Sequence, residues 1–154
     1  MIVPFHRNKE LLADIAAAGE EDGTLHLWWL GQSGFLLKWN REYAMVDPYL
    51  SDSLTRKYAG TQREHVRMTE RCIDPALLGF VPLVLSSHLH TDHCDPDTLL
   101  PLARASEGRT QQLKLLLPRS GLATAKTRLG SQLLYHRTYV FLLRYAYLFY
   151  FLFF

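Results

Sequence analysis

The chain opens with a pattern of apolar positions that predicts a helix. Leu11, Leu12, Ile15 and Ala16 recur at the three- and four-residue spacing that places side chains on one face of a helix. Asn8 precedes them, and an asparagine side chain can cap a helix by accepting a hydrogen bond from a backbone N–H of the first turn. We therefore expect a helix that is capped by Asn8 and covers part of a sheet.

Strand-like segments follow, with turn residues between them. The segments LHLWWL (25–30), FLLKW (35–39) and YAMVD (43–47) are short and apolar, and a glycine-containing turn and an Asn-Arg turn separate them. Their close spacing predicts three antiparallel strands. Residues 56–71 are polar, mixed in charge and without periodicity, so we interpret them as a loop.

Two apolar runs further along the chain predict strands that are buried on both faces. These runs are VPLVLSS (81–87) and LKLLLP (113–118). Each is followed by a predicted helix. The first begins where Asp95 supplies a capping carboxylate just before a proline, and the second covers residues 121–130. A succession of strand, helix, strand and helix predicts an α/β fold.

Length and composition fit one domain. The chain has 154 residues, of which 48% are apolar and 21% are charged, so neither disorder nor a polytopic membrane protein is indicated. The two cysteines form no spacing motif, and the first twenty residues contain no continuous apolar core of signal-peptide length. We therefore expect a cytoplasmic protein.

The charge is unevenly distributed along the chain. All fifteen acidic residues lie at or before Glu107, whereas seven of the seventeen basic residues come later. Residues 1–107 therefore carry 10 minus 15, or −5, and the remainder carries +7. An acidic first part disfavours a nucleic-acid partner, because binding to phosphates requires a basic surface.

The segment SSHLHTDHCD (86–95) directly follows an apolar run and gathers residues of the metal-ligand type. His88, His90 and Asp92 are two residues apart, so in an extended segment they project to one side, and His93 joins them as the chain turns. The carboxyl ends of strands in α/β sheets commonly build binding sites. Imidazoles and a carboxylate suit Zn²⁺, and also Mn²⁺ or Fe²⁺. We therefore expect these four residues to be metal ligands.

One ion cannot easily use four ligands from so short a segment. The economical arrangement gives His88 and His90 to one ion and Asp92 with His93 to a second ion, about 3.5 to 4 Å away. Such ions lower the pKa of bound water toward ~7, which makes hydroxide available for hydrolysis. The alternative is that these residues only cap and stabilise a loop. Four ionisable side chains packed together would then lack a compensating partner.

The segment HLHTDH (88–93) looks like the HxHxDH signature of the metallo-β-lactamase superfamily. Three longer segments, LHLWWLGQSGFLLKW, YAMVDPYLSDSL and RMTERCIDPALLGFVPLVLSSHLHTDHCDPDTL, resemble in order the first half of the branch that includes ascorbate-6-phosphate lactonase. The similarity covers residues 24–130. It implies an αββα sandwich, a site with two metal ions at one edge, and hydrolysis of a small-molecule ester, lactone or phosphodiester.

The resemblance also implies roles for individual residues. The positions matching His88, His90, Asp92 and His93 bind metal in the family, and the position matching Asp92 also orients the nucleophilic water. Asp47 matches a family position near the site, although a carboxylate in a VDP turn can equally serve as a turn cap.

The similarity to this family ends within the chain. The family completes its site with a further histidine, a bridging aspartate and a final histidine. The only histidine after His93 in this sequence is His136, and no Asp or Glu follows Glu107. We expect residues 1–132 to form the first half of the sandwich, with weak metal binding and little catalysis. The alternative is a non-catalytic fragment or a membrane-tethered binding module whose metal motif is idle.

Residues 133–154 form an apolar, aromatic tail. The last twenty residues hold ten of the nineteen aromatic side chains. Leaving ten rings in water forgoes about 15 to 30 kcal/mol of burial free energy. Three accounts remain open: an out-of-frame end, a membrane anchor over 138–154 that is shorter than the usual ~20 residues, or a buried strand against this sheet or a partner.

Two further groups of residues have a functional and a structural interpretation. His65, Arg63, Arg67 and Arg71 could meet an anionic substrate, but we interpret them as part of a solvated loop. Cys94 could be a soft metal ligand, but a small side chain packed beneath a helix is the preferred interpretation.

Overall fold

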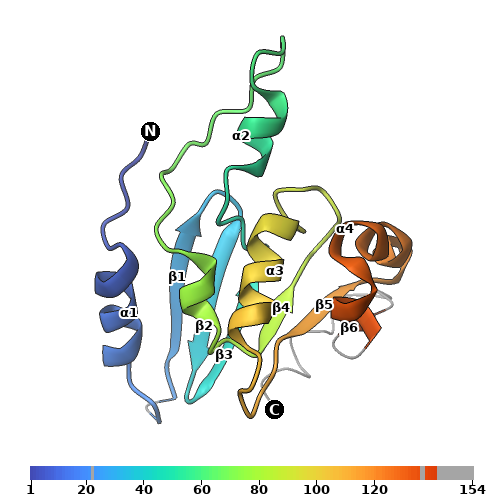
Figure 1. The fold of residues 1–154 in the computed structure, drawn as a ribbon. Helices are drawn as coiled ribbons and strands as arrows, with labels where there is room; N and C mark the ends of the chain where they lie inside the picture. The colour runs from blue at the N-terminus through green and yellow to red at the C-terminus, as the bar shows by residue number, and fades with distance from the viewer. Residues whose placement is uncertain (22, 136–137, 142–154) are drawn as a thin grey trace.

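The computed structural model describes residues 1–21, 23–135 and 138–141 of the chain, with side chains up to Gly130. They form a mixed α/β fold with one six-stranded sheet (Figure 1). The elements are α1 (Asn8–Ala17), β1 (Leu25–Gly31), β2 (Gly34–Trp39), β3 (Glu42–Val46), α2 (Ser53–Tyr58), η1 (Pro75–Leu78), β4 (Leu83–Leu85), α3 (Pro96–Ala105), β5 (Lys114–Pro118), η2 (Arg119–Gly121), α4 (Leu122–Tyr135) and β6 (Thr138–Phe141).

The strands lie side by side in sequence order, from β1 to β6. Strands β1, β2 and β3 form an antiparallel meander, and β4, β5 and β6 add to it in parallel. The predicted three antiparallel strands, the two later strands and the α/β class are therefore confirmed. The prediction that the two later strands are buried on both faces is wrong, because only alternate residues of β4 and β5 are buried. Because β3, β4 and β5 are parallel, their carboxyl ends share one edge of the sheet.

The core lies between one face of the sheet and the helices (Figure 1). Helices α1, η1, α3 and α4 contribute side chains to the same apolar cluster as the strands. Two polar contacts join α1 to this face: Trp28 Nε1 donates to Asp14 Oδ2 at 2.7 Å, and the buried Lys38 donates from Nζ to the carbonyl oxygen of Ala18 at 2.7 Å. The buried apolar side chains that the strands and these helices contribute to the cluster are Leu11, Ile15, Leu30, Leu36, Met45, Leu78, Val84, Leu99, Leu102, Ala103, Leu115, Leu117, Ala125 and Leu129.

Two predictions about local structure are wrong. Arg7, and not Asn8, is the N-cap of α1, and no side chain caps it. Asn8 instead has a φ of 41° and accepts a hydrogen bond at Oδ1 from the backbone N–H of Asp74, 3.3 Å away. Residues 56–58, expected to be loop, belong to α2, because its Leu54 is buried and donates its backbone N–H to the hydroxyl of Tyr49. The first outcome depends on a residue distant in sequence, whereas the second depends on a contact between residues five apart.

The predicted cap of α3 is confirmed. Asp95 is fully buried, and its carboxylate accepts from the backbone N–H of Asp97, from Thr98 Oγ1 at 2.6 Å and from Ser53 Oγ at 2.9 Å. In α4, Gly130 has φ 75° and ψ 163°, which interrupts the helix at the predicted end. The chain then resumes a helical path as far as Tyr135.

The aromatic tail lies only partly within the described residues. Thr138–Phe141 form β6, which pairs in parallel with β5 from Leu115 to Pro118. His136 and residues 142–154 fall outside the described residues, so the anchor predicted for 138–154 stays a hypothesis beyond Phe141. No helix in the part of the chain that is described is long and apolar enough to cross a membrane.

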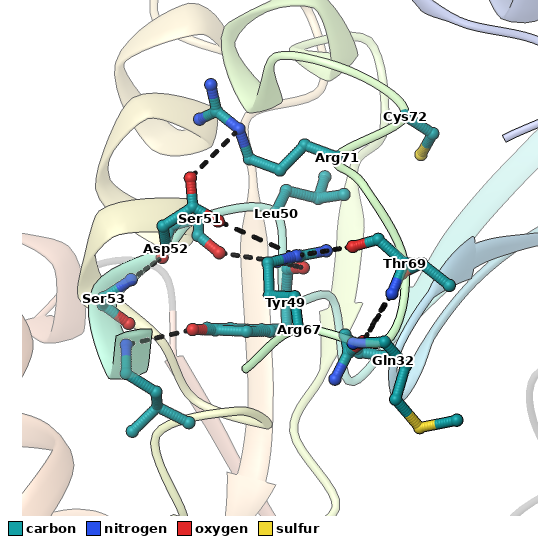
Figure 2. Close-up of polar contacts among 12 residues, drawn as sticks. Gln32, Tyr49, Leu50, Ser51, Asp52, Ser53, Arg67, Thr69, Arg71 and Cys72 are labelled. Atoms are coloured by element: carbon teal, nitrogen blue, oxygen red, sulfur yellow. Dashed lines mark hydrogen bonds and ion pairs between the residues drawn. The ribbon is translucent and has the colours of Figure 1, made fainter. Parts of the chain in front are cut away.

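Arg67 ties the segment before η1 to the loop that follows β3 (Figure 2). Its Nε donates to the carbonyl oxygen of Thr69 at 3.0 Å, and its Nη1 donates to the carbonyl oxygens of Tyr49 and Ser51. The guanidinium also lies 4.9 Å from the centre of the Tyr49 ring and 3.7 Å from Asp52. Arg67 is only 4% exposed, and this burial lowers the pKa of its guanidinium. The interpretation of Arg67 as part of a solvated loop is therefore wrong.

We predict that Arg67→Met lowers the free energy of unfolding by about 3 kcal/mol or more, because three buried carbonyl oxygens lose their donor. Arg71→Met is the matched control. Arg71 is half exposed and makes one ion pair of 3.7 Å with the same Asp52, so its loss is expected to stay below about 1 kcal/mol. Urea unfolding of both variants measures the difference. Equal losses would contradict the structural role of Arg67.

Candidate functional site

The HxHxDH segment lies at the carboxyl edge of the sheet, directly after β4. Ser86 and Ser87 follow the strand, and the backbone N–H groups of His93 and Cys94 both donate to the carbonyl oxygen of His90, at 3.0 and 2.8 Å. This turn leads to Asp95 and the start of α3. The sequence therefore folds as predicted here, with the polar cluster between a buried strand and a capped helix.

Leu89 anchors this segment to the elements beside it. Its side chain packs against Gly121, where even a Cβ atom would lie 2.0 Å from Leu89 Cδ2. Its carbonyl oxygen accepts a hydrogen bond from Arg128 Nη1 on α4. The backbone between His88 and His90 is therefore held against η2 and α4.

The His88 ring contacts the rings of both other histidines. The ring centres of His88 and His90 are 4.6 Å apart, and those of His88 and His93 are 3.9 Å apart. Asp92 Oδ2 lies 3.5 Å from His93 Nε2. The structure therefore brings together all four predicted ligands, His88, His90, Asp92 and His93.

Asp47 directly follows β3 and contacts Ser87 and His93 of this segment. Its Oδ1 accepts from the backbone N–H of Ser87 at 2.7 Å, and its Oδ2 accepts from the Ser87 hydroxyl at 2.6 Å. Oδ2 also lies 2.9 Å from His93 Nδ1. Asp47 has a φ of 46° and is 7% exposed. A buried carboxylate in the left-handed region, aimed at an imidazole, does more than cap its own turn.

Ser33 supplies a second link to the loop. It lies in the turn between β1 and β2. This turn is at the same edge of the sheet as the carboxyl end of β3. Its hydroxyl lies 2.8 Å from the carbonyl oxygen of Asp92 and 3.2 Å from that of Asp47, and both contacts have hydrogen-bond geometry. Ser87 adds a third contact, with its hydroxyl 3.1 Å from His88 Nδ1.

The imidazole and carboxylate groups of this cluster are of the types that bind divalent metal ions, but their arrangement does not form a metal-ligand shell. Among the described residues, no group of three or more His, Cys, Asp or Glu side chains has the geometry to hold a metal ion. Two imidazoles that share a zinc ion have ring centres about 5 Å apart, whereas His88 and His93 are closer and contact through their rings. His93 Nδ1 is buried and faces Asp47 Oδ2, although this contact does not have hydrogen-bond geometry.

Cys94 does not belong to the cluster. It is fully buried in the apolar core, and burial raises the pKa of its thiol. A raised pKa disfavours the thiolate form that binds metals. The preferred interpretation of Cys94, a small packed side chain, agrees with this position.

The sequence singles out the histidines, Asp92 and, through the resemblance, Asp47, but it does not single out the two serines that contact this cluster. Ser33 falls in a glycine-containing turn, and Ser87 ends an apolar run. A feature of the sequence that could have identified them is a polar residue next to the end of a strand, at one shared edge of the sheet. Ser33, Asp47 and Ser87 all have this position.

The comparisons with known proteins identify no family for this chain. No protein-family model matches the sequence, and no curated protein matches it either. The resemblance to the metallo-β-lactamase superfamily therefore stays a prediction that depends on the motif residues.

We predict that Asp47→Ala lowers the free energy of unfolding by about 3 kcal/mol, because two hydrogen bonds from Ser87 are lost and alanine is strained at positive φ. Asp97→Ala is the control. Asp97 is exposed, and its ion pair with Arg56 is a surface contact, so a loss below about 1 kcal/mol is expected. Chemical denaturation followed by tryptophan fluorescence measures both values. A loss at position 47 no larger than at position 97 would contradict the role given to Asp47.

Proposed function

We propose that the chain is a metal-dependent hydrolase of the metallo-β-lactamase type, with its ligand cluster at the carboxyl edge of the sheet. The supporting observation is the convergence of three imidazoles and two carboxylates at the ends of β3 and β4. Such a donor set, partly open to solvent, suits Zn²⁺, Mn²⁺ or Fe²⁺. The proposed substrate class is a small-molecule ester, lactone or phosphodiester.

His88, His90, Asp92 and His93 would hold the metal. A divalent ion in that place supplies a bound water whose pKa is near 7. Asp47 acts as a positioning residue: it fixes the backbone at Ser87 and lies against the His93 ring. Groups that orient a ligand in this way commonly change metal affinity by 10- to 100-fold when they are replaced.

Asp92 is the proposed catalytic residue. Its side chain is 39% exposed, so one carboxylate edge is available to a substrate or a water. The hydrogen bond from Ser33 to its carbonyl oxygen holds its backbone. A carboxylate fixed in this way can accept a proton from a water and orient that water toward a carbonyl or phosphoryl centre.

The αββα sandwich is also part of the proposal. The described residues supply one helical layer and one sheet. The second sheet and second helical layer of that architecture would lie against the face of the sheet that the helices leave open.

We predict that the purified chain binds Zn²⁺ or Mn²⁺ and that His88→Ala and His90→Ala each lower the affinity at least about tenfold. Isothermal titration calorimetry with the metal salt measures the affinity, and mass spectrometry measures metal content. His26→Ala is the matched control, because His26 lies on β1 beside Trp28 and remote from the cluster. Unchanged affinity in the His88 and His90 variants would refute the assignment.

We predict slow hydrolysis of a generic phosphodiester or lactone by the metal-loaded chain, with a rate that Asp92→Asn lowers about 100-fold. Asp97→Asn is the matched control, since it makes the same change five residues away on an exposed helix position. If metal binds but the rate equals that of metal and buffer alone, the non-catalytic binding module replaces the hydrolase.

A further inference from the structure

A single hydroxyl group lies between the buried carboxylate of Asp47 and the first of the predicted metal ligands. Ser87 Oγ is 2.6 Å from Asp47 Oδ2 and 3.1 Å from His88 Nδ1, so the three side chains form a continuous series of contacts. The backbone N–H of Ser87 donates to the other oxygen of the same carboxylate, at 2.7 Å. The positions of the protons along this series decide which nitrogen of His88 is free to bind a ligand.

The hydroxyl proton of Ser87 lies on the side of Asp47. A hydroxyl carries one proton, so Ser87 can donate to only one of its two neighbours. Its contact of 2.6 Å with Asp47 has the length of a hydrogen bond from a hydroxyl to a carboxylate, about 2.5 to 2.7 Å. An ionised carboxylate has no proton to donate, so two oxygens this close require the hydroxyl proton between them. Ser87 therefore donates to Asp47.

His88 must then be the donor in the second contact. Once the hydroxyl proton is directed to Asp47, the oxygen of Ser87 offers only lone pairs to His88 Nδ1. The distance of 3.1 Å lies within the range of an N–H···O hydrogen bond, about 2.7 to 3.2 Å. His88 Nδ1 therefore carries a proton. A neutral imidazole has a proton on one nitrogen only, so the free lone pair of His88 is on Nε2.

We propose that Ser87 is a positioning residue that sets the tautomer of His88. It accepts a hydrogen bond from Nδ1 while it donates its own proton to Asp47, and this leaves Nε2 as the nitrogen that can bind a metal ion. The tautomer follows from counting protons, whereas its use in metal binding rests on the proposed function. Histidines that bind metals usually have their other ring nitrogen held by such a hydrogen bond, which fixes both the tautomer and the ring orientation.

The same series of contacts orients the His88 ring from outside its own loop. Asp47 directly follows β3 and is 7% exposed. Ser33, in the turn between β1 and β2, lies 3.2 Å from the carbonyl oxygen of Asp47. The ring of His88 is therefore linked through Ser87 to a carboxylate that two neighbouring strands hold in place.

The other two imidazoles of the cluster do not share this arrangement. His93 Nδ1 faces Asp47 Oδ2 at 2.9 Å, but this contact lacks hydrogen-bond geometry. His90 is exposed and meets the cluster through its contact with the ring of His88. We therefore expect the hydroxyl of Ser87 to affect the tautomer of His88 and not that of His90, which makes His90 an internal reference.

Variants at two adjacent serines of the full chain test the proposal. Ser87→Ala removes the hydroxyl but keeps the backbone hydrogen bond to Asp47. Ser87→Thr keeps the hydroxyl, and the exposed position has room for the added methyl group. Ser86→Ala is the matched control, because it makes the same change one residue earlier, where the hydroxyl is fully buried and takes no part in this series of contacts.

The first measurement is heteronuclear NMR of the histidine side chains in the metal-free chain, at a pH of about 8, where an ordinary imidazole is neutral. The nitrogen chemical shifts distinguish the two tautomers, and His88→Ala identifies the signals of His88. We expect the proton on Nδ1 in the native chain, in Ser87→Thr and in Ser86→Ala. In Ser87→Ala the population should move toward the form with the proton on Nε2, because the acceptor for Nδ1 is lost.

The second measurement is the affinity of the same variants for Zn²⁺ or Mn²⁺ by isothermal titration calorimetry. Ser87→Ala is expected to lower the affinity at least about tenfold, as the loss of a group that orients a ligand commonly does. Ser87→Thr and Ser86→Ala are expected to bind the metal as the native chain does. Rescue by threonine would show that the hydroxyl is responsible.

The two measurements separate this proposal from the proposed function. A native His88 with its proton on Nε2, or a tautomer that Ser87→Ala leaves unchanged, would overturn the role of Ser87 even if the chain binds metal. Equal metal affinities of the native chain and Ser87→Ala would also overturn it. The expected tautomers together with no metal binding by any variant would support the role of Ser87 and refute the metal-dependent hydrolase.

Discussion

The carboxylate of Asp47 is the contact on which the candidate site depends. It joins the end of β3 to Ser87 at the end of β4 by two hydrogen bonds, and it lies 2.9 Å from a ring nitrogen of His93. This arrangement requires a residue that tolerates a φ of 46° and carries a charge. Aspartate meets both requirements, because its short polar side chain makes left-handed backbone accessible. Without this link, the histidine loop would be attached to the sheet only through its backbone and Ser33.

The sheet gives the molecule its second defining property, a strong difference between its faces. Helices cover one face, and the core forms there. The other face is also apolar but less buried, and its residues Leu25, Leu27 and Trp29 on β1 are more than half exposed. The site occupies the edge between these faces. A further layer packed on the less buried face of the sheet would therefore lie beside the ligand cluster.

Patterns within a few residues predicted most of the elements. Apolar runs and turn residues located β1 to β5, and the Asp95-Pro96 pair located the start of α3, because each feature depends on contacts within one or two turns of chain. Two of the predictions that failed depended on distant contacts. Asn8 turns toward Asp74. Arg67 stands in a polar segment but is buried, because it donates to the carbonyl oxygen of Thr69 in its own segment and to those of Tyr49 and Ser51 in the loop after β3.

The same distinction applies to the site. The sequence by itself determined which donors are available and where they stand, since HLHTDH follows a buried strand and precedes a capped helix. The resemblance placed Asp47 near the site, but only the tertiary structure decided which groups it contacts, because parallel pairing of β3 with β4 brings together strand ends that are 40 residues apart. The antiparallel pairing of β2 with β3 likewise brings Ser33 to this edge. It also decided that the imidazoles contact one another. The reason is physical: side-chain spacing along a strand is local, whereas the distance between two strand ends follows from hydrogen bonding across the sheet.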